Sequence, residues 1–148
     1  MKARKNLMSA SMITALVLLA LTPAAQAAEP DKAVYHIDNA PLQATKALRN
    51  IRNHLDTVSS TKVVVVTHAD GVDFLIEGAK DLANPNVNYG ALVSALKSRG
   101  VRFEVCEITL RNRNLKRDQF ILEAEFTPSG VARVTQLQIR EGFAYIKP

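Results

Sequence analysis

The sequence has 148 residues, of which 19 are Lys or Arg and 14 are Asp or Glu. Its single cysteine excludes an intramolecular disulfide, a Cys-x-x-Cys redox pair and a zinc site built from several thiolates. Three of the basic residues lie in the first five positions. Without them the net charge falls from +5 to +2, which does not favour binding to nucleic acid or to an anionic membrane.

Residues 1–27 have the three parts of a secretory signal peptide: a basic start, an apolar stretch over residues 12–21, and the small-x-small cleavage pattern Ala25-Gln26-Ala27. The apolar stretch is short for spanning a bilayer, although an uncleaved membrane anchor is the alternative. We therefore expect cleavage after Ala27, location in the periplasm, and a mature protein without stable membrane insertion. Residues 28–148 suit a single domain.

The mature chain opens with a strand that passes quickly into a helix. Residues 33–37 form a partly β-branched run that predicts the strand. Asn39 is a suitable N-cap, and Pro41 is tolerated in a first helical turn. Apolar residues then recur at helical spacing, which predicts an amphipathic helix that places these side chains over the core: Ala44, Leu48, Ile51 and Leu55.

The run over residues 62–67 is apolar without alternation, which predicts a strand covered on both faces in the middle of a parallel sheet. Residues 68–71 are expected to end this strand. Residues 74–79 predict a short helical piece, and residues 84–86 predict a loop. Asn88 is expected to cap a second helix that stops at Gly100. Its inward-facing residues should be Tyr89, Leu92, Val93 and Leu96.

The second half of the chain repeats this alternation. Residues 101–106 predict a strand, followed by a basic connection with room for a helical turn. Residues 120–126 alternate charged and apolar side chains, as edge strands do. A last helix is expected to begin at Ser129 and to end near Gly142, before a short strand over residues 143–146. Its inward-facing residues should be Val131, Val134 and Leu137.

Five strands that alternate with helices indicate the fold class, an α/β protein. Right-handed crossovers would produce a three-layer α/β/α sandwich around a mostly parallel five-stranded sheet. In such sheets, ligands collect outside the carboxyl ends of the strands.

Cys106 lies where a predicted strand gives way to a polar segment. A lone cysteine is either a small buried hydrophobe or a reactive thiol. Val101, Phe103 and Val105 share one face of the strand, so Cys106 falls on the other, more polar face. This phase favours a sulfur that reaches solvent.

Polar residues at the ends of the predicted strands are the other candidates for the site. His68 is the expected partner of Cys106, because an imidazole near a thiol favours the thiolate; the alternative is a histidine that binds backbone groups in the turn. The basic segment after Cys106 is read as a solvated loop, and not as a nucleic-acid patch, because it lacks interleaved aromatics. The candidate ligand-binding residues are His36, Asp38, Asn39, Asp70 and Arg111.

Two other readings of these residues are weaker. His36, His68 and Cys106 could together hold a transition metal, but no two of them have a local ligand spacing, so we expect no metal and no cofactor. Ser129-Gly130 could hold an anion with its backbone N–H groups, although helix capping explains the pair more simply.

Five segments resemble the DsrE/DsrF-like family, and within it the secreted branch. Each motif alone is loose, whereas their order and spacing together are fairly specific. The matching segments are VYHID (residues 34–38), LRNIRNHL (48–55), the stretch over 65–75 that contains THADGVDFL, RGVRFEVC (99–106), and the tail that includes PSGV (128–131) and EGFAYIKP (141–148).

The resemblance implies an α/β/α sandwich, assembly into homo-oligomers, and a cysteine that carries sulfur as a persulfide between partner proteins. That role would fall on Cys106, with a sulfur donor or acceptor protein as partner. Our leading hypothesis is therefore a periplasmic sulfur-handling thiol that accepts sulfane sulfur or binds a thiol compound. The alternative is a non-catalytic oligomeric binding module whose pocket at the strand ends takes a small ligand or a partner.

Overall fold

The structure is a computed structural model that describes residues 29–148. The predicted signal peptide and its cleavage site after Ala27 lie outside the described residues. Among residues 29–148, no helix combines the length and the apolar character needed to cross a membrane.

The described chain alternates strands and helices, as the sequence predicts. A 3-10 helix, Asp73–Leu75, follows β2, and another, Arg117–Gln119, precedes β4. The main elements are β1 (Lys32–Asn39), α1 (Ala40–Thr57), β2 (Lys62–Asp70), α2 (Tyr89–Lys97), β3 (Arg102–Cys106), α3 (Glu107–Arg113), β4 (Ala124–Thr127), α4 (Gly130–Glu141) and β5 (Ala144–Ile146).

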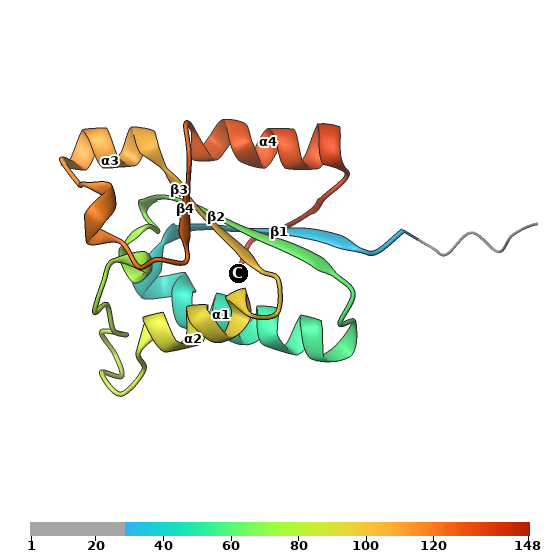
Figure 1. The fold of residues 1–148 in the computed structure, drawn as a ribbon, viewed down its shortest axis with the longest axis horizontal. Helices are drawn as coiled ribbons and strands as arrows, with labels where there is room; N and C mark the ends of the chain where they lie inside the picture. The colour runs from blue at the N-terminus through green and yellow to red at the C-terminus, as the bar shows by residue number, and fades with distance from the viewer. Residues whose placement is uncertain (1–28) are drawn as a thin grey trace, which may run out of the picture.

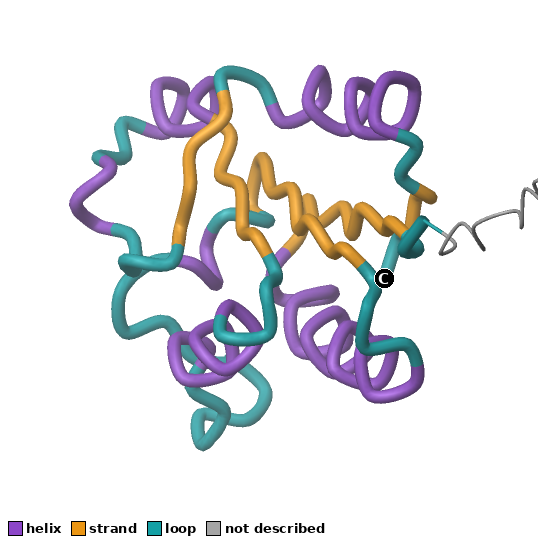
Figure 2. The backbone as a smooth tube through the Cα atoms, turned by 45° about the vertical axis from the view of Figure 1, so that its right-hand side comes forward, coloured by secondary structure: helices purple, strands orange, loops and turns teal. Residues whose placement is uncertain are grey.

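The five strands form one sheet in the order β4-β3-β2-β1-β5, and every neighbouring pair is parallel. Helices α1 and α2 cover one face, and α3 and α4 cover the other (Figure 1). The view in Figure 2 shows the same three layers, with the strands between two layers of helices. The predicted three-layer α/β/α sandwich is therefore confirmed.

The central position of β2 follows from its composition. Its four consecutive valines, residues 63–66, are all buried, because α1 and α2 pack on one face and α4 on the other. Such a strand has no solvent-exposed face and needs no polar alternation. The predicted break at His68 is wrong, because β2 continues to Asp70.

The caps of α1 and α2 match their sequence signals, and so do the buried faces of these helices except at Leu92. Asn39 accepts a hydrogen bond from the Leu42 amide at 3.1 Å, and Asn88 accepts one from the Ala91 amide at 3.3 Å. All four residues predicted to face the core from α1 are buried. In α2 the prediction for Leu92 is wrong: it is 38% exposed, because the buried face runs through Tyr89, Val93 and Leu96.

Two predicted segments are irregular. Residues 120–123 do not form a strand; Phe120 and Ile121 enter the core from a loop, where the Ile121 amide donates to the Leu75 carbonyl at 3.0 Å. Of residues 74–79, only Phe74 and Leu75 are helical; both are buried and belong to the 3-10 turn Asp73–Leu75, so the predicted longer helical piece is wrong. The core takes these apolar side chains from turns, so their burial does not require regular secondary structure.

The polar face of β3 is covered by α4. This helix is capped by Ser129 and ends at Gly142, which has a φ of 73°. Val134 and Leu137 are buried as predicted, whereas Val131 is 62% exposed and its predicted inward position is wrong. Under α4, Cys106 is only 4% exposed, so the expectation that its phase would bring it to solvent is wrong.

Candidate functional site

The parallel sheet brings the carboxyl ends of β1, β2 and β3 to one edge. His36 lies opposite Val66 in the register of β1 with β2, so His68, two residues further along β2, lies on the same face and diagonal to His36. Cys106 is the last residue of β3, on the other side of β2. The predicted candidates His36, Asp38, His68 and Cys106 therefore come from three neighbouring strands.

Cys106 lies at the junction of β3 and α3, at the bottom of a surface hollow of about 280 Å³. His68 borders the same hollow, so the structure brings the two predicted catalytic residues together there. The other lining residues are Ala69, Ile108, Thr109, Asn112, Arg113, Ser129 and Val131. A larger hollow of about 490 Å³, at the amino ends of the strands, is lined by no cysteine or histidine.

The groups around the Cys106 sulfur favour its anionic form. Burial raises the pKa of the thiol, but hydrogen bonds from the backbone N–H groups of Gly130, Thr109 and Ile108 and from the Thr109 side chain outweigh burial, so the pKa lies below its ordinary value. The Thr109 hydroxyl oxygen also accepts from the Ala69 amide at 3.0 Å, which leaves its proton available for the sulfur. The donors come from the first turns of two different helices, α3 and α4.

Gly130 allows α4 to approach the strand ends this closely. A β-carbon at this position would lie 3.2 Å from the β-carbons of both Cys106 and His68. Any larger residue would therefore press on these two side chains, and they or the first turn of α4 would have to shift by a few tenths of an ångström. This glycine links the packing of α4 to the ionisation of the thiol.

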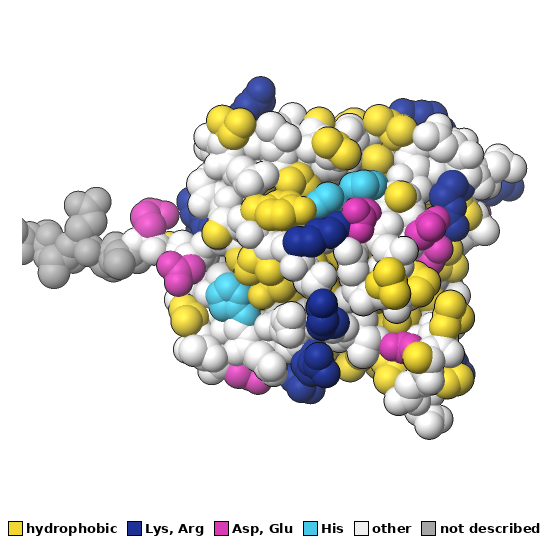
Figure 3. Space-filling model, turned by 180° about the vertical axis from the view of Figure 1, so that it is seen from behind, with side chains coloured by type: hydrophobic (Ala, Val, Ile, Leu, Met, Phe, Trp, Pro, Cys, Tyr) yellow, Lys and Arg dark blue, Asp and Glu magenta, His cyan; other side chains and the backbone are white. Residues whose placement is uncertain are grey.

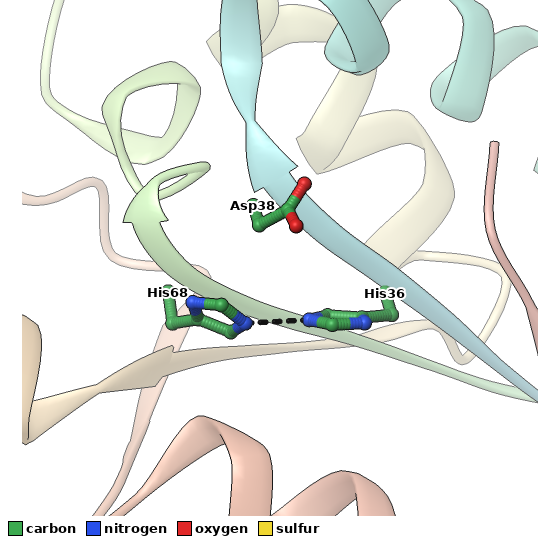
Figure 4. Close-up of side chains that lie close together, drawn as sticks. All are labelled: His36, Asp38 and His68. Atoms are coloured by element: carbon green, nitrogen blue, oxygen red, sulfur yellow. Dashed lines mark hydrogen bonds between the residues drawn. The ribbon is translucent and has the colours of Figure 1, made fainter.

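His36 and His68 form a half-buried contact pair beside the hollow. Their Nε2 atoms are 2.6 Å apart, and His36 Nδ1 is 2.8 Å from the hydroxyl of Tyr145. Figure 4 shows the two rings pointing toward one another, with Asp38 beside them on β1. Figure 3 shows adjoining histidine side chains at the surface, next to basic and acidic side chains.

The electrostatic surroundings keep both rings neutral at neutral pH. Burial lowers the pKa of His36 to about 4, with further lowering by the Lys147 ammonium and by His68, against the opposing effect of Asp38. Burial also lowers the pKa of His68. Lys147 donates to Asp38 at 2.5 Å, and this hydrogen bond lowers the pKa of the carboxyl. His68 is therefore an uncharged neighbour of Cys106, and the amide donors, not an imidazolium, favour the thiolate.

The backbone after His68 is held in an unusual conformation. Ala69 has a φ of 48°, in the left-handed region that non-glycine residues rarely occupy. Its amide is bonded to Thr109, and its carbonyl accepts from Arg113 at 3.1 Å, so α3 fixes it on both sides. These contacts fix where β2 ends and so where His68 stands relative to Cys106.

The remaining predicted ligand-binding residues lie apart from the hollow. The side chain of Asn39 is used as the cap of α1. Asp70 is exposed, with its carboxylate 3.8 Å from Arg113. Arg111 is exposed on α3 and does not line the hollow; the basic residue that does so is Arg113.

Sequence reasoning missed four contributors to the site: Thr109, Gly130, Tyr145 and Lys147. Only Gly130 gave a signal, as part of a Ser-Gly pair whose amides could hold an anion; the anionic form that the Gly130 amide favours is the thiolate of Cys106. Tyr145 and Lys147 reach the site because β5 pairs with β1 at the sheet edge, which is a tertiary contact without a local sequence signature.

Comparisons with known proteins agree with this architecture. The sequence matches the DsrE/DsrF-like family over residues 17–148. The fold is similar to that of the protein of unknown function MTH1491 from Methanobacterium thermoautotrophicum, with a TM-score of 0.69 and 30% identity over 80% of this chain and 99% of that one. It is also similar to the ychN protein from E. coli, with a TM-score of 0.66 and 16% identity over the same shares of the two chains.

A comparison with curated proteins finds no significant match. The family match covers most of the chain, including every element of the sheet and the segment that carries Cys106. The chain therefore belongs to the DsrE/DsrF-like family.

Proposed function

We propose that this protein handles sulfane sulfur in the periplasm and that Cys106 carries the sulfur as a persulfide. Membership of the DsrE/DsrF-like family suggests a function of the sulfur-relay type. The observation that carries the assignment to Cys106 is the set of hydrogen-bond donors on its sulfur, which lowers the thiol pKa and so raises the fraction of nucleophilic thiolate at neutral pH.

The proposed reaction transfers one sulfur atom from a persulfide donor to the Cys106 thiolate. The Cys106 thiolate attacks the outer sulfur of a donor R–S–SH; the new S–S bond forms on Cys106 as the donor S–S bond breaks, and the electron pair leaves with the donor as RS⁻. Transfer to an acceptor thiolate is the same step in reverse. The donors that stabilise the Cys106 thiolate also stabilise it when it is the leaving group of that second transfer.

The position of the sulfur suits a carrier that protects its cargo. With Cys106 only 4% exposed at the bottom of the hollow, a bound persulfide would extend toward the opening between α3, α4 and the end of β2. Neutral His68 on the rim is available to exchange a proton with the terminal sulfur, because burial keeps its pKa below its ordinary value.

Mass spectrometry of the exported protein tests the location and the chemistry together. We expect a mature chain that begins at Ala28 and that gains the mass of one sulfur atom after treatment with polysulfide or thiosulfate. The gain should be reversed by a thiol reductant, and it should be lost in Cys106→Ser. A chain that retains residues 1–27 would contradict the proposed export, and sulfur uptake that is equal in Cys106→Ser would contradict the role of Cys106.

The binding-module alternative is supported by one observation, the clustering of His36 and Asp38 with His68, which borders the hollow. In that case Cys106→Ser would leave ligand binding intact, whereas substitutions in the cluster would abolish it. The cluster is compatible with both functions, because His36 and Asp38 lie on β1, which is on the opposite side of β2 from Cys106 in the strand order.

A further inference from the structure

His36, Asp38 and His68 form a cluster of which the proposed sulfur chemistry of Cys106 uses only His68. One ligand atom from each of the three side chains lies within 4.8 Å of those of the other two. All three side chains are half-buried, so they are held in place by the fold while still open to solvent. We propose that these three residues bind one divalent transition-metal ion, with Zn²⁺ as the first candidate.

The donor set selects the class of metal. Two imidazoles and one carboxylate suit Zn²⁺, Fe²⁺, Co²⁺ or Ni²⁺, whereas Mg²⁺ and Ca²⁺ prefer sites made entirely of oxygen ligands. Three protein ligands leave a fourth position for water or for an external ligand, the arrangement of catalytic and transport sites more than of closed structural ones. The exposure of the cluster gives that position access to solvent.

The fold places the ligands at a suitable spacing. His36 and Asp38 are two residues apart on β1 and therefore share a face of the sheet, and His68 joins them from β2 through the strand register. The two Nε2 atoms are now 2.6 Å apart. Two Zn–N bonds at a tetrahedral angle would hold them about 3.3 Å apart, so the two nitrogens need to separate by less than an ångström and the rings need to turn until both nitrogens point at one ion.

Groups around the cluster resemble the outer shell of a metal site. The Tyr145 hydroxyl lies 2.8 Å from His36 Nδ1, where it can accept the proton of that nitrogen and leave Nε2 free to bind the metal. Lys147 is paired with Asp38 at 2.5 Å and occupies the position of a competing cation. Binding of a dication would displace this ammonium from the carboxylate.

This site differs from the histidine-cysteine set considered from the sequence. Within residues 29–148, the group of side chains whose ligand atoms lie within 4.8 Å of one another consists of His36, Asp38 and His68, and it does not include Cys106. The metal site and the sulfur site therefore share a neighbourhood through His68 but not a ligand set, and each can be removed while the other is retained. Zinc binding does not depend on the proposed sulfur chemistry.

Calorimetric titration of the untagged, chelator-treated protein with Zn²⁺ at neutral pH tests the proposal, and absorption spectra with Co²⁺ report the ligand types. We expect one ion per chain. His36→Ala and His68→Ala should each weaken binding by about 100-fold or more, and Asp38→Asn by about 10-fold. The matched controls are His54→Ala, which removes the third histidine, and Cys106→Ser. Both should bind Zn²⁺ with the affinity of the unaltered protein. The Co²⁺ spectra should show no thiolate-to-cobalt absorption band in any variant.

A further variant exploits the competing cation: Lys147→Gln should bind Zn²⁺ more tightly than the unaltered protein, because the carboxylate is then free. The circular dichroism of each metal-free variant checks that it is folded. The proposal would be overturned by a protein that binds no Zn²⁺, by binding that survives in folded His36→Ala and His68→Ala, or by binding that is lost in Cys106→Ser.

Discussion

Arg133→Met is expected to lower the free energy of unfolding by about 3 kcal/mol, because it leaves a buried carboxylate without its main partner. Arg133 contacts Glu104 through two nitrogens, with Nε 2.8 Å from one carboxylate oxygen and Nη2 3.2 Å from the other. The Glu104 side chain is 7% exposed, and its other cation, Arg102, is more distant at 3.4 Å. Urea unfolding measures the loss.

Two variants separate the charge effect from loss of packing. Arg140→Met removes an exposed arginine from the same helix and should change stability by about 0.5 kcal/mol or less. In Glu104→Gln/Arg133→Met no buried charge remains without a partner, so we expect at least half of the loss to be recovered. A double variant no more stable than Arg133→Met would show that the ion pair is not the source of the effect.

The same ion pair connects stability to the sulfur site. Glu104 precedes Cys106 by two residues on the covered face of β3, and Arg133 follows Gly130 by about one turn of α4. Loosening this contact frees the first turn of α4, whose Gly130 amide donates to the sulfur. In the fraction that stays folded, the Cys106 pKa should therefore rise in Arg133→Met and not in Arg140→Met.

Gly71→Ala is the second substitution with a large expected effect, a loss of at least about 3 kcal/mol in the free energy of unfolding. A β-carbon on Gly71 would overlap the carbonyl of Ile37 and lie 2.7 Å from the Cα of Asp38. Both obstacles are backbone atoms of β1, which cannot move aside as the end of a side chain can. The clash falls where the register of β1 with β2 shifts, between Ile37 and Asn39.

Gly90→Ala is the matched control for this substitution, since it makes the same change where the nearest atom belongs to a side chain and not to the backbone. Its β-carbon would lie 3.3 Å from the end of the Asn88 side chain and 4.0 Å from Ile121. We expect a change within about 1 kcal/mol, because alanine is the better helix former in the first turn of α2. Equal stability of Gly71→Ala and the unaltered protein in thermal or urea unfolding would contradict the close approach of the two strands.

The sequence predicted those elements whose cause is local. The four consecutive valines identify β2 as a central strand, and the caps at Asn39, Asn88 and Ser129 fix the starts of three helices. The failures occur where tertiary contacts decide. Phe120 packs edge-on against Phe126 at 5.8 Å between ring centroids and pairs with Ile76 in an isolated bridge, and the chain then turns at residues 122–123 instead of continuing the strand that the alternation suggested.

The sequence predicted the residues of the candidate site and the neighbourhood of His68 and Cys106, but not how deeply Cys106 is covered or that Asp38 joins the two histidines. His36, Asp38, His68 and Cys106 are polar residues at strand ends, which the pattern of strands alone indicates. Whether Cys106 is covered depends on Arg133, 27 positions further along the chain, which pairs with Glu104 and holds α4 over that face. The metal cluster depends in the same way on the register between β1 and β2, for which no local ligand spacing exists.

The central claim is that the fold keeps Cys106 reactive. Hydrogen-bond donors in the first turns of α3 and α4 lower the pKa of its thiol. The most direct test is the rate of alkylation of native protein by iodoacetamide as a function of pH. The account predicts that one thiol is modified and that the midpoint of the rate against pH lies below the midpoint for a small model thiol. In Thr109→Val this midpoint should shift to higher pH. A midpoint at or above that of the model thiol, or a sulfur that reacts only after unfolding, would contradict it.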